Sequence, residues 1–226
     1  MAIRDKLKTA HESRALSHPK SARARAILER LAKEYPDAGC SLDYRNEFEL
    51  IVAVVLSAQC TDAKVNRTLP ALFGKYPTAQ RMAKAHIPDV EAIVHPLGLF
   101  RSKTKNIIAL AGLISSGVPR TMAELIKLPG VGRKTANVVL GEIFSTPEGI
   151  AVDTHCHRLA RRLGLAETDT PEKIERELMT IVPKKRWTMV THYFIAHGRS
   201  LCRARRPCCS RCCVRDLCPS AGMFPE

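Results

Sequence analysis

The fold is indicated most clearly by the stretch Leu128-Pro129-Gly130-Val131-Gly132-Arg133-Lys134-Thr135-Ala136. Pro129 ends a preceding helix, and Gly130 and Gly132 allow a tight reversal with positive φ. A second helix is expected from Arg133 onward. Because its first backbone N–H groups have no partner within the helix, they and the helix dipole form a site for an anion. The segment predicts a helix–hairpin–helix that holds phosphate without reading bases, although a turn of this kind can also simply connect two helices.

The sequence on either side of this hairpin is also helical. Asn46–Gln59 is apolar nearly all round, and its length favours a buried helix over a buried strand. Residues 102–116 repeat apolar positions at helical spacing, and Thr121 opens a capping box with Glu124. Thr170-Pro171 places a cap before a proline at the first helical position. No series of alternating strands competes with these helices, so the expected fold class is all-α.

The chain is strongly basic. Its 226 residues include 36 Lys and Arg against 22 Asp and Glu, which gives a formal net charge of +14, and 45% of the residues are hydrophobic. The apolar share argues against a disordered chain, and the excess positive charge favours a polyanionic partner. Nucleic acid is the favoured partner, and an anionic membrane surface is the alternative.

The sequence carries no sign of insertion into a membrane or of export. The longest apolar runs, Leu50–Leu56 and 107–114, are far shorter than the roughly 20 residues that cross a bilayer. The first residues lack the apolar segment of a secretory signal. We therefore expect a cytoplasmic, DNA-associated monomer. Its first twenty residues are expected to form a basic arm, and Pro147 and Gly149 to mark a break between two groups of helices.

Six of the nine cysteines crowd into the C-terminal part of the chain, and four have the spacing C-x6-C-x2-C-x5-C: Cys202, Cys209, Cys212 and Cys218. Structural zinc usually uses two close pairs of ligands, whereas this run has one close pair and two longer gaps. The spacing therefore favours a [4Fe–4S] cluster held by four thiolates over a zinc ion. A metal-free tail is the least favoured alternative, because so many exposed thiols would be prone to oxidation.

Arginines surround the same loop. Part of this charge compensates the thiolates, and the rest is expected to face phosphate, which arginine binds through two donors at once. A solvated basic face is the alternative. The six arginines are Arg199, Arg203, Arg205, Arg206, Arg211 and Arg215.

Taken together, these segments resemble the endonuclease III family of DNA base-excision glycosylases. The resemblance runs from about Ala32 to Cys218, and its motifs follow the family's order. They are the segment Leu56-Ser57-Ala58-Gln59-Cys60-Thr61-Asp62, the loop Gly98-Leu99-Phe100-Arg101-Ser102-Lys103, the hairpin, Val152-Asp153-Thr154-His155 and the cysteine run.

The resemblance implies a two-lobed helix–hairpin–helix glycosylase fold. Residues 40–146 would form a six-helix domain that contains the hairpin. Residues 1–39, the arm and the first helix, would pack with 147–226 as the iron–sulfur cluster domain. The resemblance implies removal of oxidised pyrimidines from duplex DNA, followed by AP-lyase cleavage of the strand, and a [4Fe–4S] cofactor with a structural role.

The resemblance makes Lys134 the nucleophile, whose neutral amine forms a Schiff base with C1′ of the damaged nucleotide. The positive field at the start of a helix, and burial, would both disfavour the ammonium form of Lys134. A simple phosphate contact is the alternative role. Asp153 is implied as the carboxylate that takes the lysine proton and balances the cationic sugar, and it is also a favourable residue to cap a helix.

A base stacked in a duplex must be flipped out before it can react. The resemblance gives Gln59 as the side chain that enters the vacated space and Leu99 as the wedge beside the orphaned base. The remaining DNA contacts are expected from the hairpin, at Gly130, Val131, Gly132 and Arg133.

The sequence departs from the family pattern at three cysteines. Cys60 follows Gln59 where a small residue such as alanine is expected, and its thiol could alter the wedge segment or be oxidised. Cys208 and Cys213 adjoin two proposed ligands, so either could replace one of them. Two further hypotheses remain: a non-catalytic iron–sulfur protein that binds DNA or senses redox state, and a monofunctional glycosylase, which the presence of Lys134 disfavours.

Overall fold

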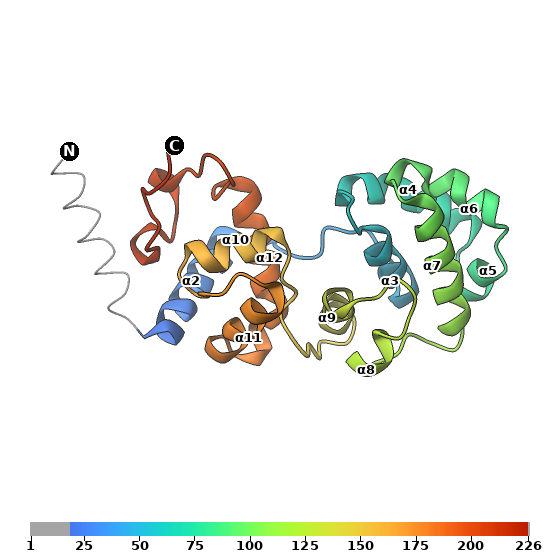
Figure 1. Cartoon of the computed structure of the whole chain (residues 1–226), viewed down its shortest axis with the longest axis horizontal. Coiled ribbons are helices and arrows are strands. Elements are labelled where there is room, and N and C mark those ends of the chain that lie inside the picture. Colours follow the sequence, from blue (N-terminus) through green and yellow to red (C-terminus); the bar gives the residue numbers. More distant parts are fainter. Residues whose placement is uncertain (1–18, 226) are drawn as a thin grey trace. The chain divides into compact units, whose positions relative to one another are not determined.

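The computed structural model describes residues 19–225, so most of the basic arm predicted for the first twenty residues lies outside the described part. Within residues 19–225 every regular element is a helix, as predicted (Figure 1). Of the helices described, none combines the length and apolar character that a membrane span requires.

The contacts between residues divide the chain into two compact units. One is Cys40–Glu148, here called the hairpin unit. The other, here called the cysteine unit, combines residues 19–39 with residues 149–225. Each unit has its own apolar core.

The hairpin unit is built around one buried helix. Helix α3 packs against α4, α7 and α9, and its residues from Glu49 to Leu56 are buried. The structure has seven α-helical segments here where six are expected, and two of them, α5 and α8, have only five and four residues. They are α3(Glu47–Leu56), α4(Asp62–Lys75), α5(Ala79–Ala83), α6(Ile87–Val94), α7(Phe100–Leu113), α8(Met122–Leu125) and α9(Arg133–Glu142), with the 3-10 helix η1(His95–Leu97) before α7.

The start of α3 is fixed by a reciprocal cap. The side chain of Asn46 accepts a hydrogen bond from the backbone N–H of Glu49 at 2.9 Å, and the Glu49 carboxylate accepts one from the N–H of Arg45 at 2.8 Å. The helix was expected to continue to Gln59, but it ends at Leu56. The chain turns there because Gln59 adopts a left-handed conformation with φ of 52°.

The capping box predicted at the start of α8 is present. Thr121 accepts from the backbone N–H of Glu124 at 3.3 Å and donates to the Glu124 carboxylate at 2.7 Å. The preceding long helix, α7, begins at Phe100 and ends at Leu113, two to three residues earlier than the apolar spacing predicts.

The cysteine unit packs helices that lie far apart in the sequence. Helix α10 contacts α11 and α12, and α2, from the start of the chain, packs against α11 and α12 (Figure 1). Pro171 begins α11 as predicted, and Thr170 occupies the N-cap position, but its side chain makes no capping hydrogen bond. The α-helices are α2(Lys20–Glu34), α10(Thr154–Arg162), α11(Pro171–Ile181) and α12(Trp187–Ser200), and the 3-10 helices are η2(Lys184–Arg186), η3(Cys209–Arg211) and η4(Arg215–Leu217).

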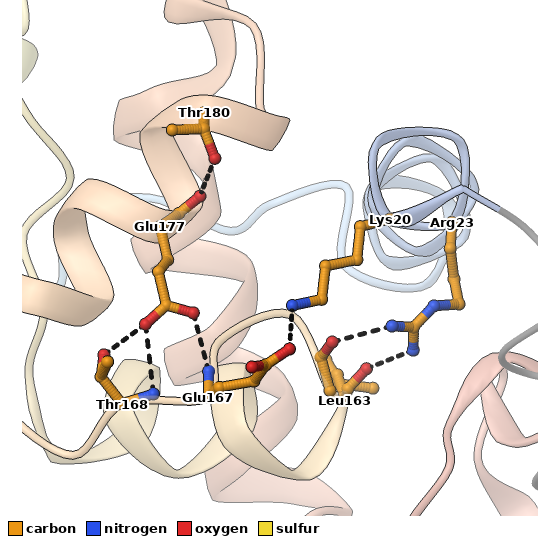
Figure 2. Close-up of polar contacts among 8 residues, drawn as sticks. Lys20, Arg23, Leu163, Glu167, Thr168, Glu177 and Thr180 are labelled. Atoms are coloured by element: carbon orange, nitrogen blue, oxygen red, sulfur yellow. Dashed lines mark hydrogen bonds and ion pairs between the residues drawn. The ribbon is translucent and has the colours of Figure 1, made fainter.

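A buried arginine ties α2 to the turn after α10. Arg23 is 1% exposed, and its guanidinium donates to the carbonyl oxygens of Leu163 at 2.5 Å, Gly164 at 2.8 Å and Leu217 at 3.3 Å. Figure 2 shows this arginine beside Lys20, whose ammonium pairs with Glu167. Burial lowers the pKa of Arg23, so the three carbonyls are what make its charge tolerable inside the unit.

Replacing Arg23 with methionine is expected to destabilise the protein by about 3 kcal/mol. The variant keeps an aliphatic stem but leaves three buried carbonyls without their donor. The matched control is Lys20→Met, which removes an exposed ion pair and should cost less than about 1 kcal/mol. Urea denaturation followed by circular dichroism measures both losses. Equal losses in the two variants would contradict the structural role of Arg23.

Candidate functional site

The hairpin has the predicted turn, but only one of its two glycines needs a left-handed conformation. The N–H of Leu128 donates to the carbonyl of Leu125 at 3.0 Å, and the N–H of Val131 donates to Leu128 at 3.1 Å. Gly130 has φ of 77°, whereas Gly132 has φ of −96°. The expectation of positive φ at Gly132 is therefore wrong, because Gly132 is the extended N-cap of α9.

Gly130 is required for close packing as well as for its conformation. A Cβ atom at this position would lie 2.9 Å from Cγ1 of Val55 on α3 and 3.0 Å from Nδ2 of Asn106 on α7. The hairpin is thus seated directly on α3 and α7. By contrast, a Cβ atom at Gly132 would meet nothing within 4 Å, so this side of the turn is open to a ligand.

Lys134 lies in the first turn of α9, beside Arg133, and both side chains are exposed. The first internal hydrogen bond of the helix runs from the N–H of Ala136 to the carbonyl of Gly132 at 2.9 Å. Gly132, the N-cap, has no side chain that could cap the backbone N–H groups of residues 133–135, which precede this first bond. The turn thus leaves room for the predicted anion, whose binding stays a prediction. The predicted burial of Lys134 is wrong, because its side chain is exposed to solvent.

The two residues expected to enter DNA, Gln59 and Leu99, share an unusual backbone. Their φ values are 52° and 48°, and both side chains are exposed, Leu99 by 58%. Left-handed conformations cost non-glycine residues about 1 kcal/mol or more and concentrate at functional positions.

Among the described residues only Ser145 shares this conformation outside glycine, and there it ends a helix. The N–H of Thr146 donates to the carbonyl of Leu140 at 3.0 Å across this helix end. Gln59 likewise follows a helix end, two residues after the C-cap of α3, whereas Leu99 is the N-cap of α7. Both Gln59 and Leu99 hold an exposed side chain in a turn.

Asp153 is the N-cap of α10 in the cysteine unit. Its Oδ1 accepts from the backbone N–H of Cys156 at 2.7 Å, and the residue is half-buried. The capping role predicted for this carboxylate is confirmed, and the cap uses only one of its two oxygens. Lys134 and Asp153 belong to different units.

The four predicted ligands line a single pocket in the cysteine unit. Cys202, Cys209, Cys212 and Cys218 share it with Cys208 and with apolar side chains that include Leu159, Leu163 and Pro207. Cys213 does not line the pocket. In the part of the chain that the structure describes, no three His, Cys, Asp or Glu side chains gather closely enough to hold a single metal ion.

The pocket disfavours free thiolates. Burial, together with charge on the other cysteines of the set, raises the pKa of Cys212 to about 12 and that of Cys218 to about 12. Deprotonating these thiols requires a positive partner in the pocket, which is what a metal centre provides. The donor set and its surroundings therefore fit a thiolate-bound cluster.

Two arginines that the sequence analysis did not single out organise the cysteine loop. Arg158 donates to the carbonyls of Gly198 at 3.0 Å and Cys202 at 3.1 Å. Arg162 donates to the carbonyls of Arg203 and Ala204, both at 2.7 Å, and reaches the Cys202 sulfur at 3.5 Å. Their i, i+4 spacing on α10 is visible in the sequence. Their partners are not, because these lie about 40 residues away.

A buried histidine adds a further contact to the pocket. His197 is 1% exposed, and burial lowers its pKa to about 4, so the imidazole is neutral. Its Nδ1 lies 2.9 Å from the Tyr35 hydroxyl and its Nε2 lies 3.4 Å from the Cys212 sulfur. The tautomer protonated at Nε2 satisfies both contacts, since it donates to sulfur and accepts from tyrosine.

The arginines around the cysteine loop form a basic surface on this unit. All six are exposed: Arg199, Arg203, Arg205, Arg206, Arg211 and Arg215. A loop that is anchored from inside by Arg158 and Arg162 thus presents positive charge on its outside.

Comparison with known proteins places the chain in a family. Residues 52–184 match the family described as HhH-GPD superfamily base excision DNA repair protein. Endonuclease III of Synechocystis sp. is 47% identical over 206 residues, which cover 89% of this chain and 94% of that protein.

Two solved structures share both fold and sequence with the chain. One is a trapped endonuclease III–DNA covalent intermediate, an estranged-adenine complex, with a TM-score of 0.83 and 43% identity over 90% of this chain and 97% of that one. The other is a non-covalent endonuclease III–DNA complex, with a TM-score of 0.84, 43% identity and the same coverage. The chain therefore belongs to the HhH-GPD superfamily of base excision DNA repair proteins and, within it, to the endonuclease III family.

Proposed function

We propose that this chain is a base-excision repair DNA glycosylase that removes oxidised pyrimidines from duplex DNA and then cleaves the strand as an AP lyase. The observation that carries the proposal is the position of Lys134. Its amine is exposed on the first turn of α9, directly after a hairpin whose open backbone N–H groups suit phosphate. A lysine placed next to bound DNA backbone is within reach of the sugar.

Lys134 supplies the nucleophile in this proposal. Its neutral amine attacks C1′, the N-glycosidic bond breaks, and the base leaves with a proton. The second proton of the amine then passes to O4′ as the bond from O4′ to C1′ breaks, which opens the sugar and leaves a Schiff base between Nζ and C1′. Removal of a C2′ proton then breaks the bond from C3′ to its phosphate oxygen, and water finally releases the lysine.

Asp153 is proposed to accept a proton and to balance the positive charge that develops during these steps. Its carboxylate takes a proton from the Lys134 nitrogen once that nitrogen has bonded to C1′, and it balances the positive sugar as the base departs. Since Oδ1 is engaged by the helix cap, Oδ2 is the oxygen proposed to take the proton. The cap fixes the orientation of the carboxylate and so serves both roles.

Gln59 and Leu99 fill the space that the flipped nucleotide leaves. Their exposed side chains and left-handed backbones support this role. Each residue sits in a turn whose backbone conformation is costly for a residue other than glycine. The glutamine can hydrogen-bond the orphaned base and the leucine can replace its stacking. Gly130, Val131, Gly132 and Arg133 would bind the DNA backbone nearby.

Reductive trapping tests the proposal. Borohydride reduces a Schiff base to a stable amine, so the purified chain should become covalently linked to an oligonucleotide that carries an abasic site. It should also excise an oxidised pyrimidine from a duplex. Salt-sensitive DNA binding without adduct or excision would instead identify a non-catalytic DNA-binding protein. Excision without an adduct would identify a monofunctional glycosylase.

The cysteine pocket is proposed to hold a [4Fe–4S] cluster through Cys202, Cys209, Cys212 and Cys218, in the domain formed by the first helix and residues 147–226. When bound, the cluster would cross-link the loop through its four cysteines, and it would take no part in removing the base. The loop then presents its exposed arginines to DNA phosphates. Cys208 lines the same pocket and is the one alternative ligand, whereas Cys213 is outside it.

Substituting single cysteines should separate ligands from neighbours. Protein purified without oxygen should contain about four irons per chain. Cys212→Ala should lose most of this iron and the associated visible absorption, because three thiolates hold a cluster poorly. The matched control is Cys213→Ser, next to it in sequence, which should keep both. One zinc per chain in the wild type, or iron loss in Cys213→Ser alone, would contradict the assignment.

A further inference from the structure

Lys103 is a buried lysine that the proposed chemistry does not use. It is 4% exposed, whereas Arg101 and Lys105, two residues away on either side, are exposed. A lysine is rarely buried without a partner that offsets the cost of removing its charge from water. Its partners are found in the turn that carries Leu99.

Lys103 binds the turn before α7 at two points. Its Nζ donates to the carbonyl oxygen of Leu97 at 2.9 Å, and its backbone N–H donates to the carbonyl of Leu99 at 3.0 Å. These two carbonyls flank Gly98, and Leu99 is the left-handed N-cap of α7, with no side-chain cap of its own. One residue therefore fixes both sides of the turn that exposes Leu99.

The other neighbour of the ammonium is Cys60, which directly follows Gln59. Burial lowers the pKa of Lys103, and the nearby Cys60 thiol opposes this shift. Cys60 is half-buried, packs against the core of the hairpin unit, and closes the Gln59 turn through its N–H to the carbonyl of Ser57 at 3.0 Å. The hydrogen bonds of Lys103, however, tie it to the Leu99 turn.

We propose that Lys103 is a positioning residue that holds the Leu99 turn in one fixed arrangement, so that the Leu99 side chain is ready to enter the duplex. This inference rests on the proposed glycosylase function. The Leu99 turn is strained, with φ of 48° at Leu99, and a strained turn relaxes unless its surroundings hold it. Without the ammonium, the Leu97 carbonyl is left buried without its donor and the turn is free to shift.

A shift of this kind should slow base flipping and leave the lysine chemistry intact. A displacement of about 1 Å at a positioned group can cost on the order of 100-fold in rate. We therefore expect Lys103→Met to slow single-turnover excision about 10- to 100-fold when the oxidised pyrimidine is paired in a duplex. The loss should be less than about threefold when the same lesion lies in an unpaired bubble, where no stacked base has to be replaced.

The matched control is Lys105→Met, which removes an equal charge from the exposed side of the same helix. It should lose affinity for DNA at most, without a difference between paired and unpaired lesions. Fluorescence of 2-aminopurine beside the lesion measures unstacking directly, and its rise should be slower in Lys103→Met alone. Urea denaturation of each variant measures its stability, so that all excision rates can be compared under conditions in which every variant is folded.

Leu99→Ala completes a double-mutant cycle. If Lys103 acts through the Leu99 turn, the double variant should be no slower than Leu99→Ala by more than about twofold. Additive losses, an equal loss on paired and unpaired lesions, or a paired-lesion rate equal to that of Lys105→Met would each overturn the inference. A wild type that neither excises the lesion nor forms the borohydride adduct would refute the proposed function itself, and that result is distinct from the other three.

Discussion

Lys134→Gln should not form the borohydride adduct with abasic-site DNA, and its single-turnover excision rate should fall by at least about 10³-fold. Glutamine has nearly the same length and polarity but no amine that can form a Schiff base. Removing a covalent nucleophile has effects of this size or larger, because the remaining groups act as a unit with it. Since Lys134 is exposed and makes no packing contact that folding needs, the variant should unfold at the same urea concentration as the wild type.

The comparison variant is Arg133→Gln, which removes the neighbouring exposed cation. It should bind DNA more weakly, with a smaller dependence of affinity on salt, yet form the adduct once DNA is saturating. If Lys134 only contacted phosphate, the two variants would behave alike. An adduct that persisted in Lys134→Gln would assign the nucleophile to another amine.

The local features of the hairpin unit follow from sequence because each is decided within a few residues. The capping box of Thr121 and Glu124 is formed by neighbours in the chain, and the tight turn follows from Pro129 and Gly130. The true role of Gly132 was not predictable from composition. A glycine at a helix N-cap and a glycine with positive φ look the same in sequence.

Features that depend on distant partners could not be predicted. Arg23, Arg158 and Lys103 read as ordinary surface cations, yet each binds backbone carbonyls inside its unit. Whether a long cationic side chain is buried depends on which carbonyls the fold leaves without N–H partners, and this is settled only when helices pack. The exposure of Lys134 was missed for the same reason.

The cysteine spacing predicted a shared pocket but could not separate ligands from neighbours. Cys208 and Cys209 are adjacent, as are Cys212 and Cys213, so spacing alone allows several sets. The structure removes Cys213 because the loop turns its side chain out of the pocket, whereas Cys208 stays in it. The direction of a side chain in an irregular loop depends on the fold around it.

Asp153→Asn should slow excision by about 10²- to 10⁴-fold while leaving the cysteine unit folded. Asparagine is as good an N-cap as aspartate, so the hydrogen bond from the N–H of Cys156 should be kept and α10 should still begin at Thr154. What the substitution removes is the negative charge and the ability to take a proton, which typically account for a loss of this size. Thermal unfolding should be unchanged within error.

Asp153→Ala separates the capping role from the chemical one. It removes the cap as well and should cost about 1 kcal/mol of stability, with no greater loss of activity than Asp153→Asn. Trapping on DNA that already carries an abasic site should fall less than excision does in both variants, since no base remains to be expelled and the carboxylate has one positive intermediate fewer to balance. If Asp153→Asn excised oxidised pyrimidines at the wild-type rate, Asp153 would be a helix cap alone, and the charge that develops on the sugar would have to be balanced by another group.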